Sequence, residues 1–471
     1  MVELKNHRNF LAALTVFTVA QLAIVLLRWD KPLIWDSSVY VGMGKNLFSL
    51  GKIGFWESFR PPALPILIGS IWKTGLFFPN LARLFGTAIS ILGAATIYRI
   101  IDIEFDRGLA LYTALILMST MVYIRWSHYF LTGIPAAVLA FVSLHYAKHS
   151  KPMKSGIVVA AAFLTRFPAA IAGTAAGITL FLNIIPLKDL TSLKFDLKDI
   201  REVLESEVKL GLSFGVPTAF YFALNHFYGS GFFSPVIGGA SVPTLNPDKY
   251  LYGLYFLKEA VVANPLLIFV PLGLYSVFRA RDTRFYPYVS GLALFYAFFT
   301  FYPHKEPRFM LLFLPMMALF AAHGIRELNL PETVSGYFTK DKLFVAAVAL
   351  VFLVNFSLVF NMNTWDNAPR SNYMSETANL EGTVAGLNPA PVVYGDFKFI
   401  AVRPETYENT SEKAFREADY FALETCSWYC SPAIDSCEQK KAELFDRLEN
   451  ETKVFEDSAS QCSYRIYELN N

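Results

Sequence analysis

Long apolar stretches recur through the first 360 residues of this chain and constrain its fold more than any other feature of the sequence. The first runs from Phe10 to Leu27, and at about 1.5 Å per residue a helix of this length crosses roughly 30 Å of hydrocarbon. Ten further candidate spans follow: 81–100, 108–124, 131–147, 156–166, 168–185, 208–225, 264–279, 285–302, 309–325 and 342–360. About eleven such segments predict an all-α polytopic membrane protein embedded in a lipid bilayer.

Composition and charge divide the chain into two parts. Charged residues make up only 17% of it, against about 25% in soluble globular proteins, which excludes collagen, coiled coil and intrinsic disorder. Residues 361–471 hold 19 acidic and 10 basic residues, a net charge of −9, whereas the remainder carries +11. We therefore expect a membrane domain at 1–360 and a separately solvated domain at 361–471, and no nucleic-acid binding.

Positive charge in the loops predicts the sidedness of the spans. Lys5 and Arg8 precede the first span, which lacks a small-residue cleavage site, so we expect a retained helix and a cytoplasmic N-terminus. Five basic clusters then fall where the alternation requires the cytoplasm: Arg99 to Arg107, Lys148 to Lys154, Lys188 to Arg201, Arg279 to Arg284, and Arg326 to Lys342. One long kinked helix through Arg166 would invert everything downstream, but Lys-rich loops on both sides argue against it. Residues 361–471 are therefore predicted to be extracytoplasmic.

All the cysteines lie in this last domain, and they support its exterior placement. An even set confined to one domain predicts two disulfides, although the spacing leaves all three pairings open. A four-thiolate zinc site is the alternative, disfavoured because the spacing lacks paired Cys-x-x-Cys knuckles. Two glycosylation sequons, Asn409-Thr410-Ser411 and Asn450-Glu451-Thr452, share the domain. The disulfide candidates are Cys426, Cys430, Cys437 and Cys462.

Alternating patterns in the same domain predict a small α/β fold. Strands are expected at Pro391 to Tyr394, Tyr420 to Leu423 and Tyr464 to Tyr467, and a helix at Glu438 to Leu448.

The first exterior loop, residues 28–80, is too long for a simple connection and holds a candidate base. Asp36 precedes an amphipathic run of which Tyr40 is part, and this run predicts a helix along the membrane interface. Asp36 is a candidate general base, with Asp30 and Glu57 as competitors and a helix N-cap as the structural alternative. After Pro65 the apolar stretch is short, which favours a re-entrant or surface helix.

A second set of charges lies in later exterior loops. His304-Lys305-Glu306-Pro307-Arg308 precedes an apolar run, and guanidinium and ammonium groups at such a place suit a phosphate. Arg166 lies at the end of a predicted hairpin and is a second anion-binding candidate. The alternatives are snorkelling of Arg60 or Arg166 to headgroups and an interfacial cluster with a Lys-Glu pair. Arg125 has weaker support, His128 is more suited to a structural role, and no metal constellation or Gly-rich phosphate loop is apparent.

These motifs resemble the GT-C superfamily of integral-membrane glycosyltransferases. Trp35-Asp36-Ser37-Ser38-Val39-Tyr40 resembles the family's acidic motif after its first helix, with Ser37 where a second acid is usual. Arg60-Pro61-Pro62-Ala63-Leu64-Pro65 is similar to the Pro-rich segment of aminoarabinose-transferase-like and protein O-mannosyltransferase-like members. His304-Lys305-Glu306-Pro307-Arg308-Phe309 resembles the His-Lys-Glu motif of dolichyl-phosphate-mannose-dependent mannosyltransferases. The acid that many relatives carry before a proline in the second exterior loop is missing at 131–135.

The resemblance implies inverting transfer of a sugar, with mannose favoured, from a polyprenyl (dolichyl) phosphate to an acceptor hydroxyl on the exterior face. Asp36 would act as the base, with no metal and no cofactor besides the donor substrate. The acceptor stays open among a glycolipid, a lipid-linked oligosaccharide and a protein. A membrane transporter or lipid flippase is the alternative, and it predicts internal repeats that the sequence does not display. The donor phosphate would be bound by Arg60, Arg166, His304, Lys305 and Arg308, with Tyr40, Glu57 and Glu306 in support.

Overall fold

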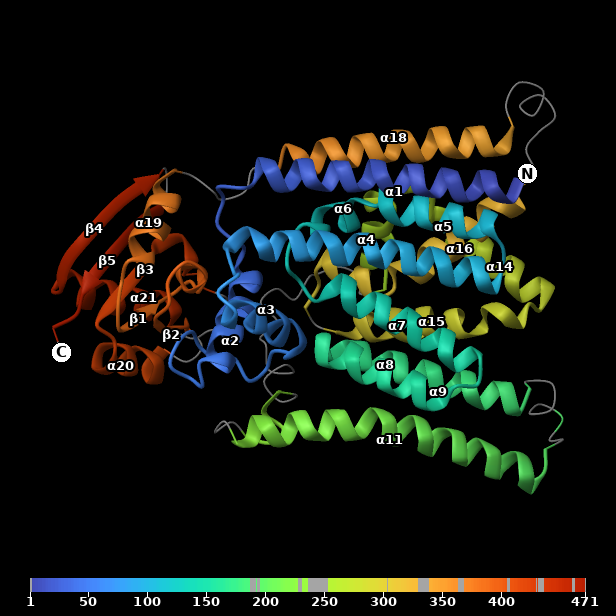
Figure 1. Cartoon of the computed structure of the whole chain (residues 1–471), viewed down its shortest axis with the longest axis horizontal. Coiled ribbons are helices and arrows are strands. Elements are labelled where there is room, and N and C mark those ends of the chain that lie inside the picture. The colour runs from blue at the N-terminus through green and yellow to red at the C-terminus, as the bar shows by residue number, and fades with distance from the viewer. Residues whose placement is uncertain are drawn as a thin grey trace.

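A helical body and a small α/β domain at one end of it make up the chain (Figure 1). The computed structural model describes residues 2–186, 192, 195–227, 231–235, 253–302, 304–328, 339–362, 368–404, 407–428, 430, 436–459 and 462–470. The basic clusters predicted at Lys188 to Arg201 and Arg326 to Lys342 lie partly outside these residues. The predicted all-α membrane part followed by a small α/β part is the architecture observed.

Each predicted span coincides with helical structure. The helices are α1 (Val2–Leu27), α2 (Trp35–Phe48), α3 (Ala63–Lys73), α4 (Pro79–Glu104), α5 (Arg107–Ser119), α6 (Met121–Ser127), α7 (Gly133–Lys148), α8 (Pro152–Thr165), α9 (Ile171–Ile184), α11 (Leu197–Phe227), α13 (Tyr255–Ala263), α14 (Val270–Ala280), α15 (Tyr286–Phe301), α16 (Leu314–Glu327) and α18 (Lys340–Phe360). Short 3-10 turns add η1 (Phe167–Ala170), η2 (Pro265–Phe269), η3 (Thr283–Phe285) and η4 (Pro307–Leu312).

Four helical segments in the described part of the chain are long and apolar enough to cross a membrane. They are His7–Leu27, Pro79–Glu104, Phe167–Ile184 and Lys340–Phe360. The predicted span 108–124 is broken instead, because α5 and α6 meet at Thr120 with a bend of 68°, and together they make a fifth candidate. The prediction of about eleven crossings therefore stays a prediction.

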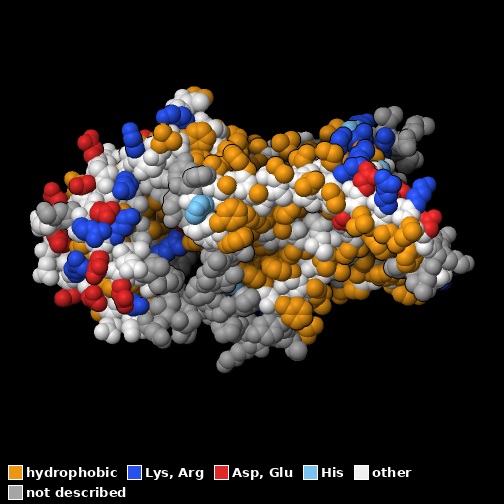
Figure 2. Space-filling model, turned by 90° about the horizontal axis from the view of Figure 1, so that it is seen from below, with side chains coloured by type: hydrophobic (Ala, Val, Ile, Leu, Met, Phe, Trp, Pro, Cys, Tyr) orange, Lys and Arg blue, Asp and Glu red, His pale blue; other side chains and the backbone are white. Residues whose placement is uncertain are grey.

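The surface of the helical body suits a bilayer. Figure 2 shows hydrophobic side chains over the body, with charged side chains gathered at the C-terminal domain and at the opposite end. On α11, for example, Leu212 is 62% exposed and Phe220 is 65% exposed. Such a continuous apolar surface is stable next to lipid and not next to water.

Helices α8 and α9 form a hairpin around Arg166. Arg166 itself is extended, between the end of α8 and η1. Val159 precedes Arg166 by as many residues as Gly173 follows it. In space the two are neighbours, since a Cβ on Gly173 would be 3.1 Å from Val159. The chain therefore reverses at Arg166, as the Lys-rich loops predicted, and the alternative of one kinked helix is wrong.

The C-terminal domain has a mixed five-stranded sheet in the order β2-β1-β3-β5-β4. Strand β1 is parallel to β2 and to β3, whereas β5 is antiparallel to β3 and β4. Its elements are α19 (Ala368–Ala378), β1 (Thr383–Gly386), η5 (Ala390–Val393), β2 (Lys398–Ala401), α20 (Tyr407–Glu417), β3 (Tyr420–Glu424), η7 (Thr425–Ser427), α21 (Cys437–Glu449), β4 (Thr452–Ala459) and β5 (Cys462–Glu468).

Most of the predicted elements of this domain are confirmed. Strands β3 and β5 and helix α21 occupy the predicted segments. The strand predicted at Pro391 to Tyr394 is wrong, because Ala390–Val393 form the 3-10 turn η5. Pro389 and Pro391 lack the N–H that a strand ladder needs, and their fixed φ suits the first turn of a helix.

The strands β2, β1, β3 and β5 are buried on both faces, and their alternating residues point to different cores. On β3, Phe421 and Leu423 pack with α20 and α21, whereas Ala422 points to the opposite face. That second face packs against α19 and also against Val39, Met43 and Phe55 from the first loop. The segment 28–80 is thus part of the core of the C-terminal domain.

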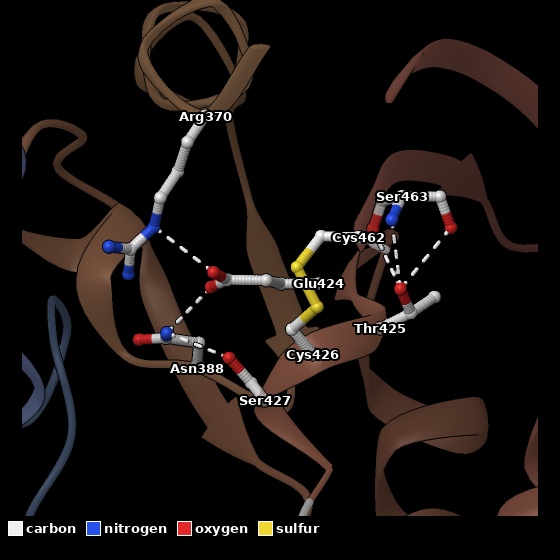
Figure 3. Close-up of a disulfide and its surroundings, with 8 residues drawn as sticks. All are labelled: Arg370, Asn388, Glu424, Thr425, Cys426, Ser427, Cys462 and Ser463. Atoms are coloured by element: carbon white, nitrogen blue, oxygen red, sulfur yellow. Dashed lines mark hydrogen bonds and ion pairs between the residues drawn. A yellow bond between two sulfur atoms is a disulfide. The ribbon is translucent and has the colours of Figure 1, made fainter. Parts of the chain in front are cut away.

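The cysteines form two disulfides, as predicted, and the zinc alternative is wrong. Cys430 pairs with Cys437, and Cys426 pairs with Cys462. The second bridge joins the segment after β3 to the start of β5 (Figure 3). Beside it the buried Glu424 is held by Arg370 Nε at 3.0 Å and Asn388 Nδ2 at 2.6 Å, which ties α19 to the parallel strands.

Candidate active site

Helix α2 carries Asp36 and is enclosed by protein. Ten of its 14 residues are buried, so the predicted helix along the membrane interface is wrong. The C-terminal domain covers one side of α2, and α3 crosses the other side where Gly44 meets Gly69. A Cβ on Gly69 would collide with the carbonyl of Gly44, so this close crossing requires glycine. Asp36 therefore stands on a fixed element.

The carboxylate of Asp36 is held by two arginines from distant segments. Arg60 Nη1 lies 2.8 Å from Asp36 Oδ1, and Arg308 Nη1 donates to Asp36 Oδ2. The N-cap position of α2 is Ile34, so the alternative of Asp36 as an N-cap is wrong. The snorkelling alternative for Arg60 is also wrong, because its guanidinium pairs with the carboxylates of Asp36 and Glu57.

A small pocket brings four of the predicted site residues together, namely Asp36, Tyr40, Arg166 and Arg308. It is lined by Asp36, Tyr40, Trp126, Leu131, Thr132, Gly133, Ile134, Arg166, Arg308 and Leu311. The pocket thus joins Asp36 to Arg166 and to Arg308 of the 304–308 segment. The competing acid Asp30 is exposed and is not among the lining residues.

Arg166 differs from the other arginines of the site because no carboxylate in the described part of the chain forms an ion pair with it. Its Nη1 donates to Thr132 Oγ1 at 3.2 Å, and its guanidinium lies 5.2 Å from the centre of the Phe309 ring. Among the described residues its buried Nε has no hydrogen-bond partner. A buried donor of this kind has free capacity for an anion in the pocket.

The charged residues of the 304–308 segment have two different roles. Glu306 Oε1 lies 2.7 Å from His304 Nε2 and accepts from Arg308 Nη2 at 3.1 Å, so these three form a chain that ends on Asp36. The alternative of a Lys-Glu pair in this segment is wrong, because Glu306 pairs with His304 and Arg308. Lys305 turns away from them.

Lys305 caps the end of α15. Its Nζ donates to the carbonyls of Phe299 at 2.6 Å and Thr300 at 2.7 Å, and also to that of Tyr302. A cation at the C-terminus of a helix satisfies its last carbonyls and its dipole. The structure thus does not place Lys305 with the donor-phosphate residues, contrary to the prediction.

Two of the predicted supporting residues, Tyr40 and Glu57, lie around Arg60, whereas Glu306 lies with His304 and Arg308. The guanidinium of Arg60 is 5.6 Å from the centre of the Tyr40 ring, and its Nε donates to Glu57 Oε2 at 2.6 Å. Glu57 is only 5% exposed and has a second partner, Arg403 of the C-terminal domain. Sequence analysis missed Arg403, and no local motif marks it, since its significance comes from the packing of two distant segments.

The electrostatics keep Asp36 ionised. Burial alone raises the pKa of Asp36, but the charges and hydrogen bonds of Arg60 and Arg308 outweigh it and hold the pKa well below its ordinary value of 3.8. A carboxylate in this state is a weak base for as long as both guanidinium groups stay on it.

Two residues with weaker predictions lie outside the pocket. Arg125 stacks on Trp126, with its guanidinium 4.9 Å from a ring centre. His128 is fully buried and its Nε2 lies 3.1 Å from Arg28 Nη1, which agrees with the predicted structural role.

Within the described part of the chain, the structure brings together one metal-compatible trio that the sequence did not suggest. Glu104, His145 and His149 offer ligand atoms within 4.8 Å of one another, at the end of α4 remote from Asp36. The carboxylate of Glu104 is already bonded by Lys148 Nζ at 2.7 Å and Tyr288 Oη at 2.7 Å. The ammonium group opposes a metal cation at this place, so the trio is better suited to an ion-pair network.

The chain resembles known proteins both in sequence and in fold. The sequence model of the Alg9-like mannosyltransferase family matches residues 64–381. ArnT from Cupriavidus metallidurans, solved with undecaprenyl phosphate, has a similar fold, with a TM-score of 0.63, 12% identity, and coverage of 96% of this chain and 97% of ArnT.

A second similar fold is the archaeal oligosaccharyltransferase AglB from Archaeoglobus fulgidus, solved with an inhibitory peptide and a dolichol phosphate. Its TM-score is 0.57 at 13% identity, with coverage of 97% of this chain and 74% of AglB. No curated protein sequence matches the chain.

Proposed function

This chain belongs to the Alg9-like mannosyltransferase family and is a GT-C glycosyltransferase of the membrane. On that premise we propose a specific reaction for it. It transfers a mannosyl residue from a polyprenyl (dolichyl) phosphate to an acceptor hydroxyl on the extracytoplasmic face. The observation that carries the proposal is one pocket in which Asp36 faces Arg166 and Arg308, contributed by three distant segments.

The charge of the cluster supports a phosphodiester as the ligand. Around the pocket, the cations Arg60, Arg166, Arg308 and Arg403 are connected to the anions Asp36, Glu57 and Glu306. These seven groups leave one positive charge unmatched, and the arginine without an ion-pair partner in the described residues is Arg166. A sugar phosphodiester carries one negative charge, so it would complete the balance.

The proposed chemistry is a single displacement. The acceptor oxygen forms a bond to the anomeric carbon while the bond from that carbon to the phosphate oxygen breaks, which inverts the configuration. The proton of the acceptor hydroxyl passes to Asp36, and the bonding pair leaves with the polyprenyl phosphate. That leaving group is stable as an anion and needs no proton. Arg60, Arg166 and Arg308 stabilise its second charge, with His304 held beside them by Glu306.

Donor binding would also release the base. A phosphate in the pocket competes with Asp36 for Arg60 and Arg308, and each guanidinium that turns toward the phosphate raises the proton affinity of Asp36. The donor would therefore bind before the acceptor reacts. Lys305 has no part in this proposal, because its ammonium group is committed to the end of α15.

The exterior location of the reaction is supported by the domain that covers α2. Two disulfides and exposed Asn409 and Asn450 in their sequons are typical of a non-cytoplasmic compartment. Because this domain packs on the helix that carries Asp36, both belong on the same side of the bilayer. The acceptor is a glycolipid, a lipid-linked oligosaccharide or a protein.

The test is transfer of radiolabelled sugar by the full-length enzyme in lipid vesicles. Donors would be polyprenyl-phosphate mannose, the corresponding glucose compound and GDP-mannose, each with a membrane extract as the source of acceptors, with and without EDTA. The proposal expects transfer from polyprenyl-phosphate mannose, retained in EDTA. Transfer from GDP-mannose alone, or a preference for glucose, would overturn the donor or the sugar.

A further inference from the structure

We infer that the C-terminal domain sets the position and charge balance of the active-site arginine Arg60 through the ion pair of Arg403 with Glu57. This inference rests on the proposed function and deepens it. It makes Arg403 a positioning residue for binding of the donor phosphate.

The contact path is continuous. Arg403 Nη2 donates to Glu57 Oε1, and Arg60 Nε donates to the other carboxylate oxygen of Glu57 at 2.6 Å. Arg60 Nη1 in turn reaches Asp36 at 2.8 Å. Charges of alternating sign therefore run from the end of strand β2 to the proposed base, and Glu57, Arg60 and Asp36 each have two partners of opposite charge.

Burial makes Glu57 sensitive to the loss of either partner. Its side chain is 4% exposed, whereas Arg403 is 25% exposed and Arg60 17% exposed. A buried carboxylate with one partner removed is strongly destabilised, because water cannot replace the lost hydrogen bond. Without Arg403, Glu57 would draw Arg60 toward itself and away from the pocket.

The backbone fixes this arrangement. Gly54 bridges Lys398 in parallel, with Gly54 N donating to Phe397 O at 2.8 Å and Phe399 N donating to Gly54 O at 2.9 Å. The loop thus runs beside β2 in the same direction, and Glu57 comes within reach of the Arg403 side chain. Gly54 has a φ of +73°, and a Cβ there would collide with the carbonyl of Gly42 in α2.

Both arginines also share one aromatic side chain. The ring centre of Phe59 lies 5.2 Å from the guanidinium carbon of Arg403 and 5.8 Å from that of Arg60. On the other side of the loop, Tyr221 Oη of α11 donates to the carbonyl of Arg60 at 3.2 Å. The loop is therefore held between the domain and the helical body, and Arg403 is the charged contact that the domain makes with Glu57.

The test uses the full-length enzyme and four variants. Arg403→Gln removes the charge, Arg403→Lys keeps it, and Glu57→Gln/Arg403→Gln removes both members of the pair. Arg416→Gln is the control, since Arg416 is 72% exposed on α20 of the same domain and pairs only with Glu417 among the described residues. Donor KM and kcat are measured for each, together with binding of a short-chain polyprenyl phosphate and the unfolding temperature.

The expected pattern depends on charge. Arg403→Gln raises donor KM and the dissociation constant for polyprenyl phosphate by about tenfold, because the cluster loses its excess positive charge. Arg403→Lys stays within about threefold of the wild type, and the double variant recovers most of the loss because the balance is restored. Arg416→Gln behaves as the wild type.

Two results would overturn the inference. One is unchanged donor KM and polyprenyl-phosphate binding in Arg403→Gln. The other is a loss in Arg403→Gln that the added Glu57→Gln does not relieve, which would mean that Arg403 only holds the domain in place. If the wild type transfers no sugar, the proposed function fails, but the binding series still decides the role of Arg403.

Discussion

Arg308 donates a hydrogen bond to the carboxylate of Asp36 although the two residues are 272 positions apart in the sequence. The pairing joins the segment 28–80 to the segment before α16, and Arg60 binds the other oxygen of the same carboxylate. The structure thus has an acid neutralised by two cations beside a third, Arg166, that lacks an ion-pair partner in the described residues. The predictions below follow from this asymmetry.

Replacing Asp36 by Asn should abolish the base and leave donor binding intact. We expect transfer to fall by about a thousandfold, the usual effect of losing a general base. Donor KM should not rise, because Arg60 and Arg308 become freer to bind the phosphate. Asp30→Asn is the matched control, since Asp30 is exposed, and it should retain full activity. Full activity in Asp36→Asn would reject the assignment of the base.

Replacing Arg166 by Gln should weaken donor binding more than it weakens folding. The variant loses the arginine without an ion-pair partner in the described residues, so donor KM should rise by roughly ten- to a hundredfold. The unfolding temperature should hold or increase, because a buried, incompletely bonded guanidinium is removed. The control is Arg125→Gln, whose side chain stacks on Trp126 outside the pocket lining. Equal donor KM in both variants would contradict the assignment.

Lys305→Met should lower stability and spare donor affinity. The substitution leaves three carbonyl groups near the end of α15 without their donor, at a cost of about 1–3 kcal/mol in the free energy of unfolding. Thermal unfolding in detergent measures the first effect and donor KM the second. A large rise in donor KM at unchanged stability would return Lys305 to the phosphate site.

The ion pairs of Asp36 should stabilise the protein at neutral pH and fail only in strong acid. Because its pKa is lowered from an ordinary 3.8, the stabilisation is fully present above that value and is lost as the pH falls through the lowered pKa. The stability difference between the wild type and Asp36→Asn should therefore be constant from neutral pH to about pH 5 and shrink below pH 4. A difference that already shrinks between pH 7 and pH 5 would mean that the pairs are absent.

The two sequons should report the sidedness of the C-terminal domain. Asn409 and Asn450 are exposed, so expression in a membrane that performs N-glycosylation should add glycans. Asn450→Gln and Asn409→Gln should each remove one glycan, seen as a shift on a gel before and after deglycosylation. Absence of glycans, combined with labelling of the domain from the cytoplasmic side, would invert the proposed topology.

Sequence patterns predicted what depends on local chemistry. Apolar runs located the helices, the exclusive position of Cys426, Cys430, Cys437 and Cys462 in one domain predicted the disulfides, and alternation found β3 and β5. Charges in the loops between apolar runs identified Asp36 as a candidate base. This inference is local, because a lone acid in an apolar neighbourhood is uncommon.

The misses concern features that only tertiary packing decides. Nothing near Lys305 tells whether its ammonium group faces the pocket or the end of α15, because both lie within reach of a lysine side chain. Helix α2 has the sequence pattern of a surface helix, but in the folded chain the C-terminal domain covers it. The importance of Arg403 depends on a pairing with Glu57 across the two predicted domains.

The bridge between Gly54 and Lys398 bears on how a cell makes this protein. The ribosome synthesises the Asp36 loop roughly 340 residues before the strand that fixes it, so the loop waits unfinished through most of translation. A chain cut short before β2 would insert its helices and yet leave the loop without its scaffold. We therefore expect the loop that carries Asp36 to become ordered only once the C-terminal domain has been made.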